Sequence, residues 1–246
     1  FLKKNIMRTY GLIGKNLTNT FSKIYFKNKF KKEHITNSQY LDFEIQSISD
    51  FKELLKKKKI SGLNVTIPYK ESIIKFLDEL SFEAGKIGAV NTIQIKNGKL
   101  VGHNTDHIGF TKSIYSKLDE RKKAIILGNG GAAKAIRYSL NKLGIIHKTI
   151  SRNSKFNYSD FNASMCMEYD IIINTTPLGV YPDINCAPEI PYEFLSNKHL
   201  LFDLTYNPLE TKFLKNGKIN NTKIQNGLNM LEIQAEESWK IWNKKN

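Results

Sequence analysis

A glycine loop between an apolar run and an amphipathic segment constrains this chain more than any other feature. Residues 124–127 are all apolar, which is typical of a parallel strand buried on both faces. The loop Gly128-Asn-Gly-Gly-Ala-Ala133 follows directly, and helical periodicity then continues to residue 143. Gly128 permits a tight turn, and Gly130 lets the backbone approach a phosphate. This order of strand, loop and helix predicts a dinucleotide-binding unit with the phosphates at the helix start.

Strand-like and helix-like segments alternate along almost the whole chain. After the glycine loop we expect strands at 147–151, 170–174 and 200–204, which indicates a doubly wound parallel sheet. Before the loop the expected strands are 10–13, 40–45, 63–67, 89–95 and 99–103, and the expected helices are 20–30, 51–55, 71–80 and 108–118. The dipeptide Asn97-Gly98 predicts a tight hairpin turn. The fold class is therefore α/β, closed by a helix over 227–242 whose apolar face holds Leu228, Leu231, Ala235, Trp239 and Trp242.

Length and composition limit the kinds of protein that this chain can be. Its 246 residues, 40% of them hydrophobic, can bury the cores of two modest domains. No apolar run approaches the ~20 residues of a membrane span, so we expect no membrane partner. Cys166 and Cys186 are the two cysteines, too few for a disulfide framework. A reducing, cytoplasmic location is the expectation that fits.

The net charge of +15 does not make this chain a nucleic-acid-binding protein. The basic residues comprise 34 lysines and 4 arginines, whereas arginine is the better reader of phosphates and bases. Lysine runs at 29–32 and 56–59 are typical of solvated helix ends. We therefore expect no nucleic-acid partner, although the charge would attract anionic ligands.

The strand after the glycine loop indicates which dinucleotide is bound. A site for NAD usually has Asp or Glu at the end of this strand to hold the ribose hydroxyls. Here the strand ends in Ser151-Arg152-Asn153 with no acid. The guanidinium of Arg152 suits a 2′-phosphate, which favours NADP over NAD. An ordinary surface role for Arg152 is the alternative.

Polar groups at the ends of the first-half strands predict a substrate site. Asn64-Val-Thr-Ile-Pro-Tyr-Lys70 has polar Asn64 and Thr66 on one face and ends near Lys70. Residues 89–92 and 102–106 add amides, hydroxyls and one carboxylate. A polyhydroxylated ligand needs this mixture, although turns and caps use the same residue types. The five histidines show no metal-binding spacing, so we expect no metal.

Several motifs taken together resemble the shikimate dehydrogenase family over essentially the whole chain. They are Tyr10-Gly-Leu-Ile-Gly14, Asn64-Val-Thr-Ile-Pro-Tyr-Lys70, Gly88-Ala-Val-Asn-Thr92, Asn104-Thr-Asp106, Gly128-Asn-Gly-Gly-Ala132, Asn174-Thr-Thr-Pro-Leu-Gly179, Asp203-Leu-Thr-Tyr206, and Asn226-Gly227 followed by Gln234. The resemblance implies a substrate domain over 1–106, a Rossmann NADP domain over 107–226, and a last helix, 227–246, that returns to the first domain. The implied activity is the reversible NADPH-dependent reduction of 3-dehydroshikimate to shikimate, a step in aromatic amino-acid biosynthesis.

The resemblance also implies roles for individual residues. Lys70 would donate and accept the proton, as a base or as a charged donor and positioner, with Asp106 as its catalytic partner. The groups implied to bind the substrate are Thr20, Ser22, Thr66, Asn91, Asp106, Tyr206 and Gln234. The groups implied to bind NADP are Gly128, Asn129, Gly130, Gly131, Ala132, Ser151, Arg152, Asn153, Leu204 and Gly227. The implied partner is the small-molecule substrate, and a monomer and a homodimer both stay open.

The sequence departs from the family pattern in places and leaves two other functions open. Asn19-Thr-Phe-Ser22 stands where the family usually has His-Ser-x-Ser at the substrate carboxylate. His107 replaces a usual Gly, and Phe82 replaces an often polar residue near the cofactor. One alternative is a paralogue that acts on quinate, or on both quinate and shikimate. The other is a non-catalytic binding protein of the same fold, which the intact Lys70 and Asp106 disfavour.

Overall fold

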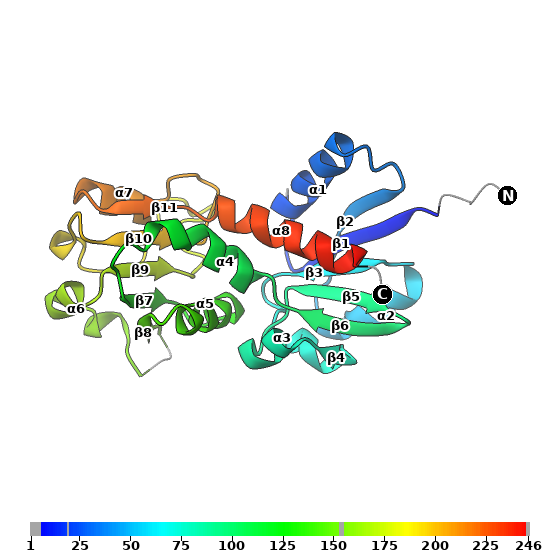
Figure 1. The fold of residues 1–246 in the computed structure, drawn as a ribbon, viewed down its shortest axis with the longest axis horizontal. Helices are drawn as coiled ribbons and strands as arrows, with labels where there is room; N and C mark the ends of the chain where they lie inside the picture. Colours follow the sequence, from blue (N-terminus) through cyan, green and yellow to red (C-terminus); the bar gives the residue numbers. More distant parts are fainter. Residues whose placement is uncertain (1–5, 19, 153–154, 245–246) are drawn as a thin grey trace. The chain divides into compact units, whose positions relative to one another are not determined.

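The structure is a computed structural model that describes residues 6–18, 20–152 and 155–244 (Figure 1). The chain forms two compact units. Unit 1 comprises Phe1–Thr105 and Gln234–Asn246, and unit 2 comprises Asp106–Ile233. The sequence placed the domain boundaries after Asp106 and after Asn226. The contacts place the second boundary inside the last helix.

A six-stranded mixed sheet in the order β2-β1-β3-β5-β6-β4 forms the centre of unit 1. Its strands are β1 (Arg8–Gly14), β2 (Ser38–Glu44), β3 (Gly62–Val65), β4 (Glu79–Leu80), β5 (Thr92–Lys96) and β6 (Lys99–His103). β1 runs parallel to both β2 and β3, whereas β5 is antiparallel to β3 and β6. Asn97 and Gly98 have φ of 51° and 79°, so the predicted turn dipeptide closes the β5–β6 hairpin in the left-handed region.

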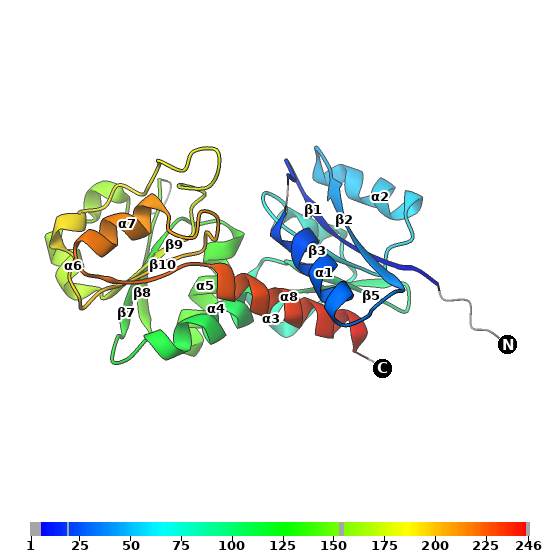
Figure 2. The same ribbon diagram turned by 90° about the horizontal axis from the view of Figure 1, so that it is seen from above.

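Helices cover both faces of this sheet. They are α1 (Phe21–Lys32), α2 (Phe51–Lys57), α3 (Phe82–Ile87) and the second half of α8 (Leu228–Asn243), with short 3₁₀ segments η1 (Ile48–Asp50) and η2 (Ser72–Phe76). One face of β1, with Tyr10 and Leu12, packs against α1 and α8, while Ile13 belongs to the core on the other face (Figure 2). Period-2 alternation along a strand produces this division into two cores.

Aromatic packing fixes the C-terminal part of α8 to unit 1. The rings of Tyr10 and Trp242 stack with centroids 4.8 Å apart, and Trp242 Nε1 donates to the Ile93 carbonyl at 3.0 Å. A Cβ at Gly62 would lie 2.5 Å from the Trp242 ring, so only glycine fits there. Of the predicted helix face, Ala235, Trp239 and Trp242 pack in this core, whereas Leu231 belongs to unit 2.

A buried lysine joins α1 to α8. Lys29 Nζ lies 2.6 Å from Glu33 Oε1 and 2.8 Å from Glu236 Oε1, and the Tyr25 hydroxyl donates to Glu236. Burial acts to raise the pKa of Glu236, but the hydrogen bonds from Lys29 and Tyr25 outweigh it and hold that pKa below its ordinary 4.5. Glu236 therefore stabilises the fold above its ordinary pKa, and this contribution is lost as the pH falls through the lowered value.

Glu236→Gln is expected to lower the free energy of unfolding by about 1–2 kcal/mol at neutral pH. The estimate is modest because the Glu236 side chain is 36% exposed and water screens the pair. Urea unfolding should show the difference at pH 7 and a smaller one well below pH 4.5, where Glu236 is protonated. Glu53→Gln, in an exposed pair with Lys57, is the control. A pH-independent difference would contradict the assignment.

Unit 2 has a five-stranded parallel sheet in the order β11-β10-β9-β7-β8. Its strands are β7 (Lys123–Leu127), β8 (Ile146–Ile150), β9 (Ile171–Asn174), β10 (Leu200–Asp203) and β11 (Lys223–Gln225). The parallel pairings run outward from β7 to β8 on one side and to β9 on the other. The doubly wound sheet predicted from the alternation of strands and helices is therefore confirmed, and the glycine loop follows β7, which lies between β8 and β9.

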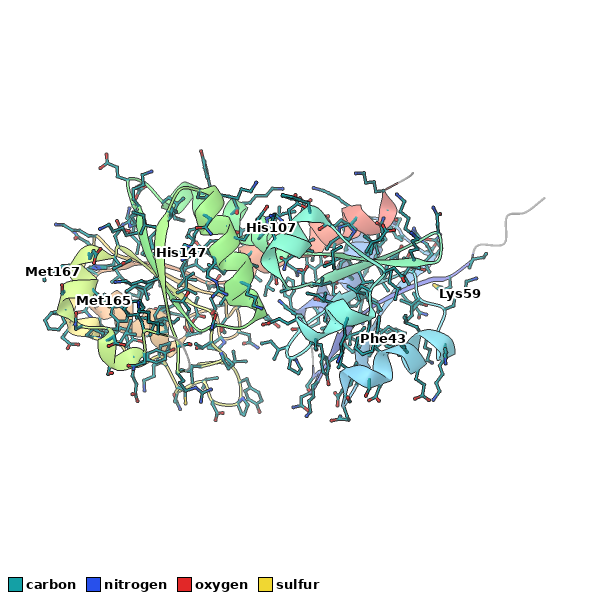
Figure 3. All side chains as sticks on the ribbon, turned by 90° about the horizontal axis from the view of Figure 1, so that it is seen from below. Phe43, Lys59, His107, His147, Met165 and Met167 are labelled. Atoms are coloured by element: carbon teal, nitrogen blue, oxygen red, sulfur yellow. The ribbon has the colours of Figure 1, made fainter. Side chains whose placement is uncertain are left out.

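Helices lie on both faces of the parallel sheet and make three layers. They are α4 (Asp106–Ile114), α5 (Gly131–Lys142), α6 (Ala163–Glu168) and α7 (Lys212–Ile219), with 3₁₀ segments η3 (Tyr115–Lys117), η4 (Tyr158–Asp160) and η5 (Tyr192–Phe194). One core contains α4 and α5 residues together with Met230, and the other contains α6 and α7 residues. On α6, Met165 is buried and Met167 is 82% exposed (Figure 3). The short helix thus covers the sheet with one side only.

The helix predicted over 71–80 is wrong. The chain forms only the 3₁₀ segment η2 and then extends as β4, with Glu79 opposite Val101 of β6. Lys99 Nζ lies 2.6 Å from Glu79 Oε1, and the Leu100 N–H donates to Asp78 Oδ2 at 2.7 Å. Strand pairing with a distant segment therefore overrides the local helical periodicity.

Among the helices of the described residues, none has the length and apolar character that a membrane span requires.

Candidate active site

The glycine loop of unit 2 has the backbone geometry of a phosphate cradle. Gly128 has φ +104°, and a Cβ there would lie 2.6 Å from Thr175 Oγ1. Both the backbone conformation and the lack of space for a side chain therefore require glycine. Gly130 is the extended N-cap of α5, and a Cβ there would meet nothing within 4 Å. The start of α5, Gly131 and Ala132, therefore borders open space where a phosphate can approach its N–H groups. The Asn129 side chain is held by Arg137, whose Nη1 donates to Asn129 Oδ1 at 2.8 Å.

A positively charged side chain, that of Arg152, follows β8 and lies beside a cavity. Ser151 is buried, Arg152 is exposed, and Asn153 lies outside the described residues. Arg152 lines a cavity of about 790 Å³ with Tyr158 and Leu178, among other residues of unit 2. Burial raises the pKa of Tyr158, and the nearby positive charge of Arg152 acts against that rise. The strand end thus places a guanidinium where a large anionic ligand has room.

The structure brings Leu204 and Gly227 together. A Cβ at Gly227 would lie 2.0 Å from the Leu204 carbonyl oxygen, and the Gly227 N–H donates to the Thr205 carbonyl at 3.0 Å. Buried Asp203 fixes this loop, since it accepts from Thr211 Oγ1 at 2.6 Å and from the Thr205 N–H at 3.0 Å. Two residues 23 positions apart, both expected at the cofactor, therefore share one backbone contact.

Gly227→Ala is expected to cost about 1–3 kcal/mol of unfolding free energy, because the added methyl group forces the backbone away from Leu204. We also expect a higher KM for NADP, since the Leu204 segment would move. Thermal unfolding and initial rates measure the two effects. Gly85→Ala is the matched control, because a Cβ at Gly85 meets nothing within 4 Å. An unchanged Tm and KM in Gly227→Ala would show that the close contact does not constrain the loop.

Lys70 follows β3 in unit 1 and is half-buried. Its carbonyl accepts from the Val90 N–H at 2.7 Å, which ties it to the segment before β5. The Thr66 N–H donates to the Ile13 carbonyl at 2.9 Å, and a Cβ at Gly14 would lie 2.6 Å from Thr66 Cγ2. Gly14 thus makes room for the Thr66 side chain at the end of the sheet.

Asn91 and Gln234 are brought together in a buried polar cluster. Asn91 Nδ2 lies 3.3 Å from Gln234 Oε1 and donates to Thr105 Oγ1 at 2.9 Å. The Thr105 N–H donates to Asn91 Oδ1 at 2.7 Å. These bonds fix the orientation of two amides that the sequence assigned to the substrate, from segments 143 residues apart.

Asn64 does not lie on an open polar face as the sequence predicted. Its side chain is only 4% exposed, and Asn64 Oδ1 accepts from the Tyr40 hydroxyl at 2.8 Å. Asn64 Nδ2 lies 3.1 Å from Thr92 Oγ1 and 3.0 Å from Ser238 Oγ. The residue is therefore part of the buried cluster that supports the strand ends, because a buried amide must satisfy its own hydrogen bonds.

The two hydroxyl residues before and at the start of α1 both contact β2. Thr20 Oγ1 donates to Asp42 Oδ1 at 2.8 Å, and the nearby Ser22 hydroxyl acts to lower the pKa of Tyr40. Burial raises the pKa of Tyr40 well above its ordinary value, so its phenol stays neutral. The sequence assigned Thr20 and Ser22 to binding the carboxylate of the substrate. In the structure, the carboxylate of Asp42 lies beside Thr20.

The remaining assigned residues are placed in separate elements. Asp106 is the first residue of α4, 4% exposed, and belongs to unit 2, as does half-buried Tyr206 after β10. Lys70 belongs to unit 1, so its pairing with Asp106 stays a prediction. Within the described part of the chain, no group of three His, Cys, Asp or Glu side chains is placed to hold a metal.

Sequence reasoning missed Tyr40, Asp42 and Ser238. Tyr40 and Asp42 are two apart on β2 and therefore share a face, while Leu41 and Phe43 pack in the other core. This alternation was available in the sequence, but only the structure shows that the polar face meets α1. Ser238 lies one helical turn after Gln234, and that spacing was the available signal.

Comparison with known proteins agrees with this geometry. A sequence model of the shikimate dehydrogenase substrate-binding domain matches residues 12–93. A shikimate dehydrogenase (NADP(+)) of Clostridium beijerinckii is 38% identical, covering 96% of this chain and 92% of the relative. The crystal structure of the Aquifex aeolicus shikimate dehydrogenase is 34% identical with a TM-score of 0.86, covering 96% of this chain and 92% of that chain. A shikimate dehydrogenase solved in complex with NADP+ is 35% identical with a TM-score of 0.85, covering 96% of this chain and 90% of that chain. This chain belongs to the shikimate dehydrogenase family.

Proposed function

We propose that this chain catalyses the reversible NADPH-dependent reduction of 3-dehydroshikimate to shikimate, a step in aromatic amino-acid biosynthesis. One observation carries the proposal. A chain that matches NADP-dependent shikimate dehydrogenases over 96% of its length has Lys70 after β3 and Asp106 at the start of α4. Lys and Asp are residue types that can transfer or position a proton beside a bound substrate.

NADPH, when bound, supplies the hydride, and the chain supplies orientation and the proton. Lys70 donates a proton to the carbonyl oxygen during reduction and accepts it during oxidation, and Asp106 is its catalytic partner and binds a ring hydroxyl. Thr66, Asn91 and Gln234 bind the other ring hydroxyls. The Asn91–Gln234 contact supports this assignment, because it fixes both amides before substrate arrives.

The carboxylate of the substrate lies at Thr20 and Ser22, with Tyr206 near it. These hydroxyls come from the beginning of α1, and Tyr206 follows β10. The departure at Thr20 keeps the hydroxyl and adds a methyl group. Hydroxyl groups bind a carboxylate by donating hydrogen bonds to it.

The cofactor lies along the ends of the parallel strands of unit 2. The pyrophosphate binds at Gly128 to Ala132, where the open space at Gly130 leaves the α5 N–H groups accessible. Ser151, Arg152 and Asn153 hold the 2′-phosphate end, and Leu204 and Gly227 border the nicotinamide. The positive charge of Arg152 supports NADP over NAD.

The chain works in the cytoplasm as a monomer or a homodimer, with small molecules as its partners. Its two cysteines support a reducing compartment: Cys166 is buried and Cys186 is exposed, both as free thiols. Burial raises the pKa of Cys166 to about 11, so this thiol is unreactive.

A four-way panel tests the proposed function. Initial rates are measured by absorbance for shikimate and quinate, each with NADP and with NAD. We expect shikimate with NADP to give the highest kcat/KM. A preference for quinate would favour the paralogue, and no turnover of any pair by folded protein would favour a binding protein.

A further inference from the structure

Two hydroxyl protons at the carboxylate end of the proposed substrate site, those of Thr20 and Tyr40, are already used inside the protein. Thr20 Oγ1 donates its single proton to Asp42 Oδ1 at 2.8 Å. Tyr40 donates its proton to Asn64 Oδ1 at 2.8 Å. A hydroxyl has one proton to give. Thr20 and Tyr40 therefore offer oxygen lone pairs at this end, beside the carboxylate of Asp42.

Asp42 is a half-buried charge with one cation beside it. Its side chain is 12% exposed, and Lys23 Nζ lies 3.5 Å from Asp42 Oδ2. The Lys23 side chain is 52% exposed, so water weakens its compensation of the carboxylate. A substrate carboxylate hydrogen-bonded to Thr20 would come within roughly 6 Å of Asp42, two hydrogen-bond lengths away.

We propose that Asp42 is a specificity-determining residue that weakens binding of a carboxylate at this end and lets the same site also accept a neutral, hydroxyl-bearing end. The inference rests on the proposed function, since it concerns the same substrate site. The further substrate class is a neutral polyhydroxylated ring alcohol, whose hydroxyl can donate to Thr20 Oγ1 and Asp42. In its oxidation the ring C–H hydride passes to NADP+ and the hydroxyl proton passes to Lys70, which leaves a ketone.

Two physical effects act in the same direction. To bind a carboxylate, Thr20 must withdraw its proton from Asp42 and give up a charge-assisted hydrogen bond. The two carboxylates then repel each other, and the side chain of Asp42 is only 12% exposed. A hydroxyl on the ligand avoids both costs, because it brings its own proton. Specificity is the difference between these two affinities.

Asp42→Asn tests the inference, because it removes the charge and keeps the shape. The probes are shikimate and its neutral analogue, in which the carboxylate is reduced to a hydroxymethyl group, each with NADP. We expect the KM for shikimate to fall by roughly 5–30-fold. The ratio of kcat/KM for shikimate to that for the analogue should rise by a similar factor, with the KM for NADP unchanged. Glu53→Gln removes the same charge from exposed α2 and should change nothing.

Lys23→Met is a second variant, and we expect it to change the KM for shikimate in the opposite direction. Without the ammonium group of Lys23, Asp42 repels a carboxylate more strongly, so the KM for shikimate should rise by roughly 3–10-fold. The effect should largely disappear in the Asp42→Asn background, because the two residues act on each other.

The outcomes separate the inference from the proposed function. If the unmodified chain turns over shikimate but Asp42→Asn leaves the substrate ratio within twofold, the inference is overturned and the function stands. If the unmodified chain forms no NADPH, the proposed function fails. Calorimetric titration of shikimate into both NADP-loaded proteins then decides the inference without turnover, because equal affinities, or no binding to either, overturn it.

Discussion

Lys70→Met is expected to lower kcat by about 10²–10⁴-fold, the usual range for a general acid–base group. Methionine keeps much of the length of the side chain and removes the ammonium group. Lys70 is half-buried after β3, and its carbonyl is held by the Val90 N–H, so the fold should tolerate the change. The KM for shikimate should change little, because the hydroxyl and amide contacts remain.

The control for Lys70 is Lys75→Met, a lysine that is exposed in η2. Circular dichroism and initial rates should show two folded proteins of which only one has lost activity. Asp106→Asn should also lower kcat, and should weaken binding if Asp106 holds a ring hydroxyl. Near-normal kcat in folded Lys70→Met would mean that this lysine has only a structural role in the turn after β3.

Arg152→Ala is expected to raise the KM for NADP roughly 10–150-fold, with much less effect on NAD. A hydrogen bond to a charged group is worth about 1.5–3 kcal/mol, which corresponds to this range. Only the 2′-phosphate distinguishes the two cofactors, so a contact with it changes one KM and not the other. Initial rates with both cofactors, at saturating shikimate, measure the difference.

Lys142→Ala, at the end of α5, removes one positive charge from the same unit and serves as the control for Arg152. It accounts for any general attraction of the +15 chain for an anionic cofactor. If Arg152→Ala changes the KM values for NADP and NAD equally, Arg152 does not read the 2′-phosphate.

The parts of the fold that could be predicted are those that local sequence determines. The glycine loop is one: positive φ at Gly128 and close packing after it need particular residues at fixed spacing. The β5–β6 hairpin is another, because Asn97 and Gly98 alone can set the turn. Continuous apolar runs likewise identified β7, β9 and β10, which are buried on both faces.

The parts that could not be predicted depend on partners far away in the chain. Residues 71–80 have helical spacing, but β6 offers Glu79 and Leu80 a strand edge to pair with. Asn64 looked like a ligand-facing amide, yet Tyr40 and Ser238 enclose it from 24 and 174 residues away. No local pattern reports such contacts, so the chemistry of Asp42 beside Thr20 emerged only from the fold.

The measurement that tests the central claim most directly is the stoichiometry of the reaction. Purified chain is given shikimate and NADP, NADPH is followed by absorbance, and the organic product is identified by NMR. Our account predicts one 3-dehydroshikimate formed for each NADPH, and reversal of the reaction when NADPH and 3-dehydroshikimate are supplied. Folded protein that forms no NADPH from shikimate, or that forms it with a different product, would contradict the account.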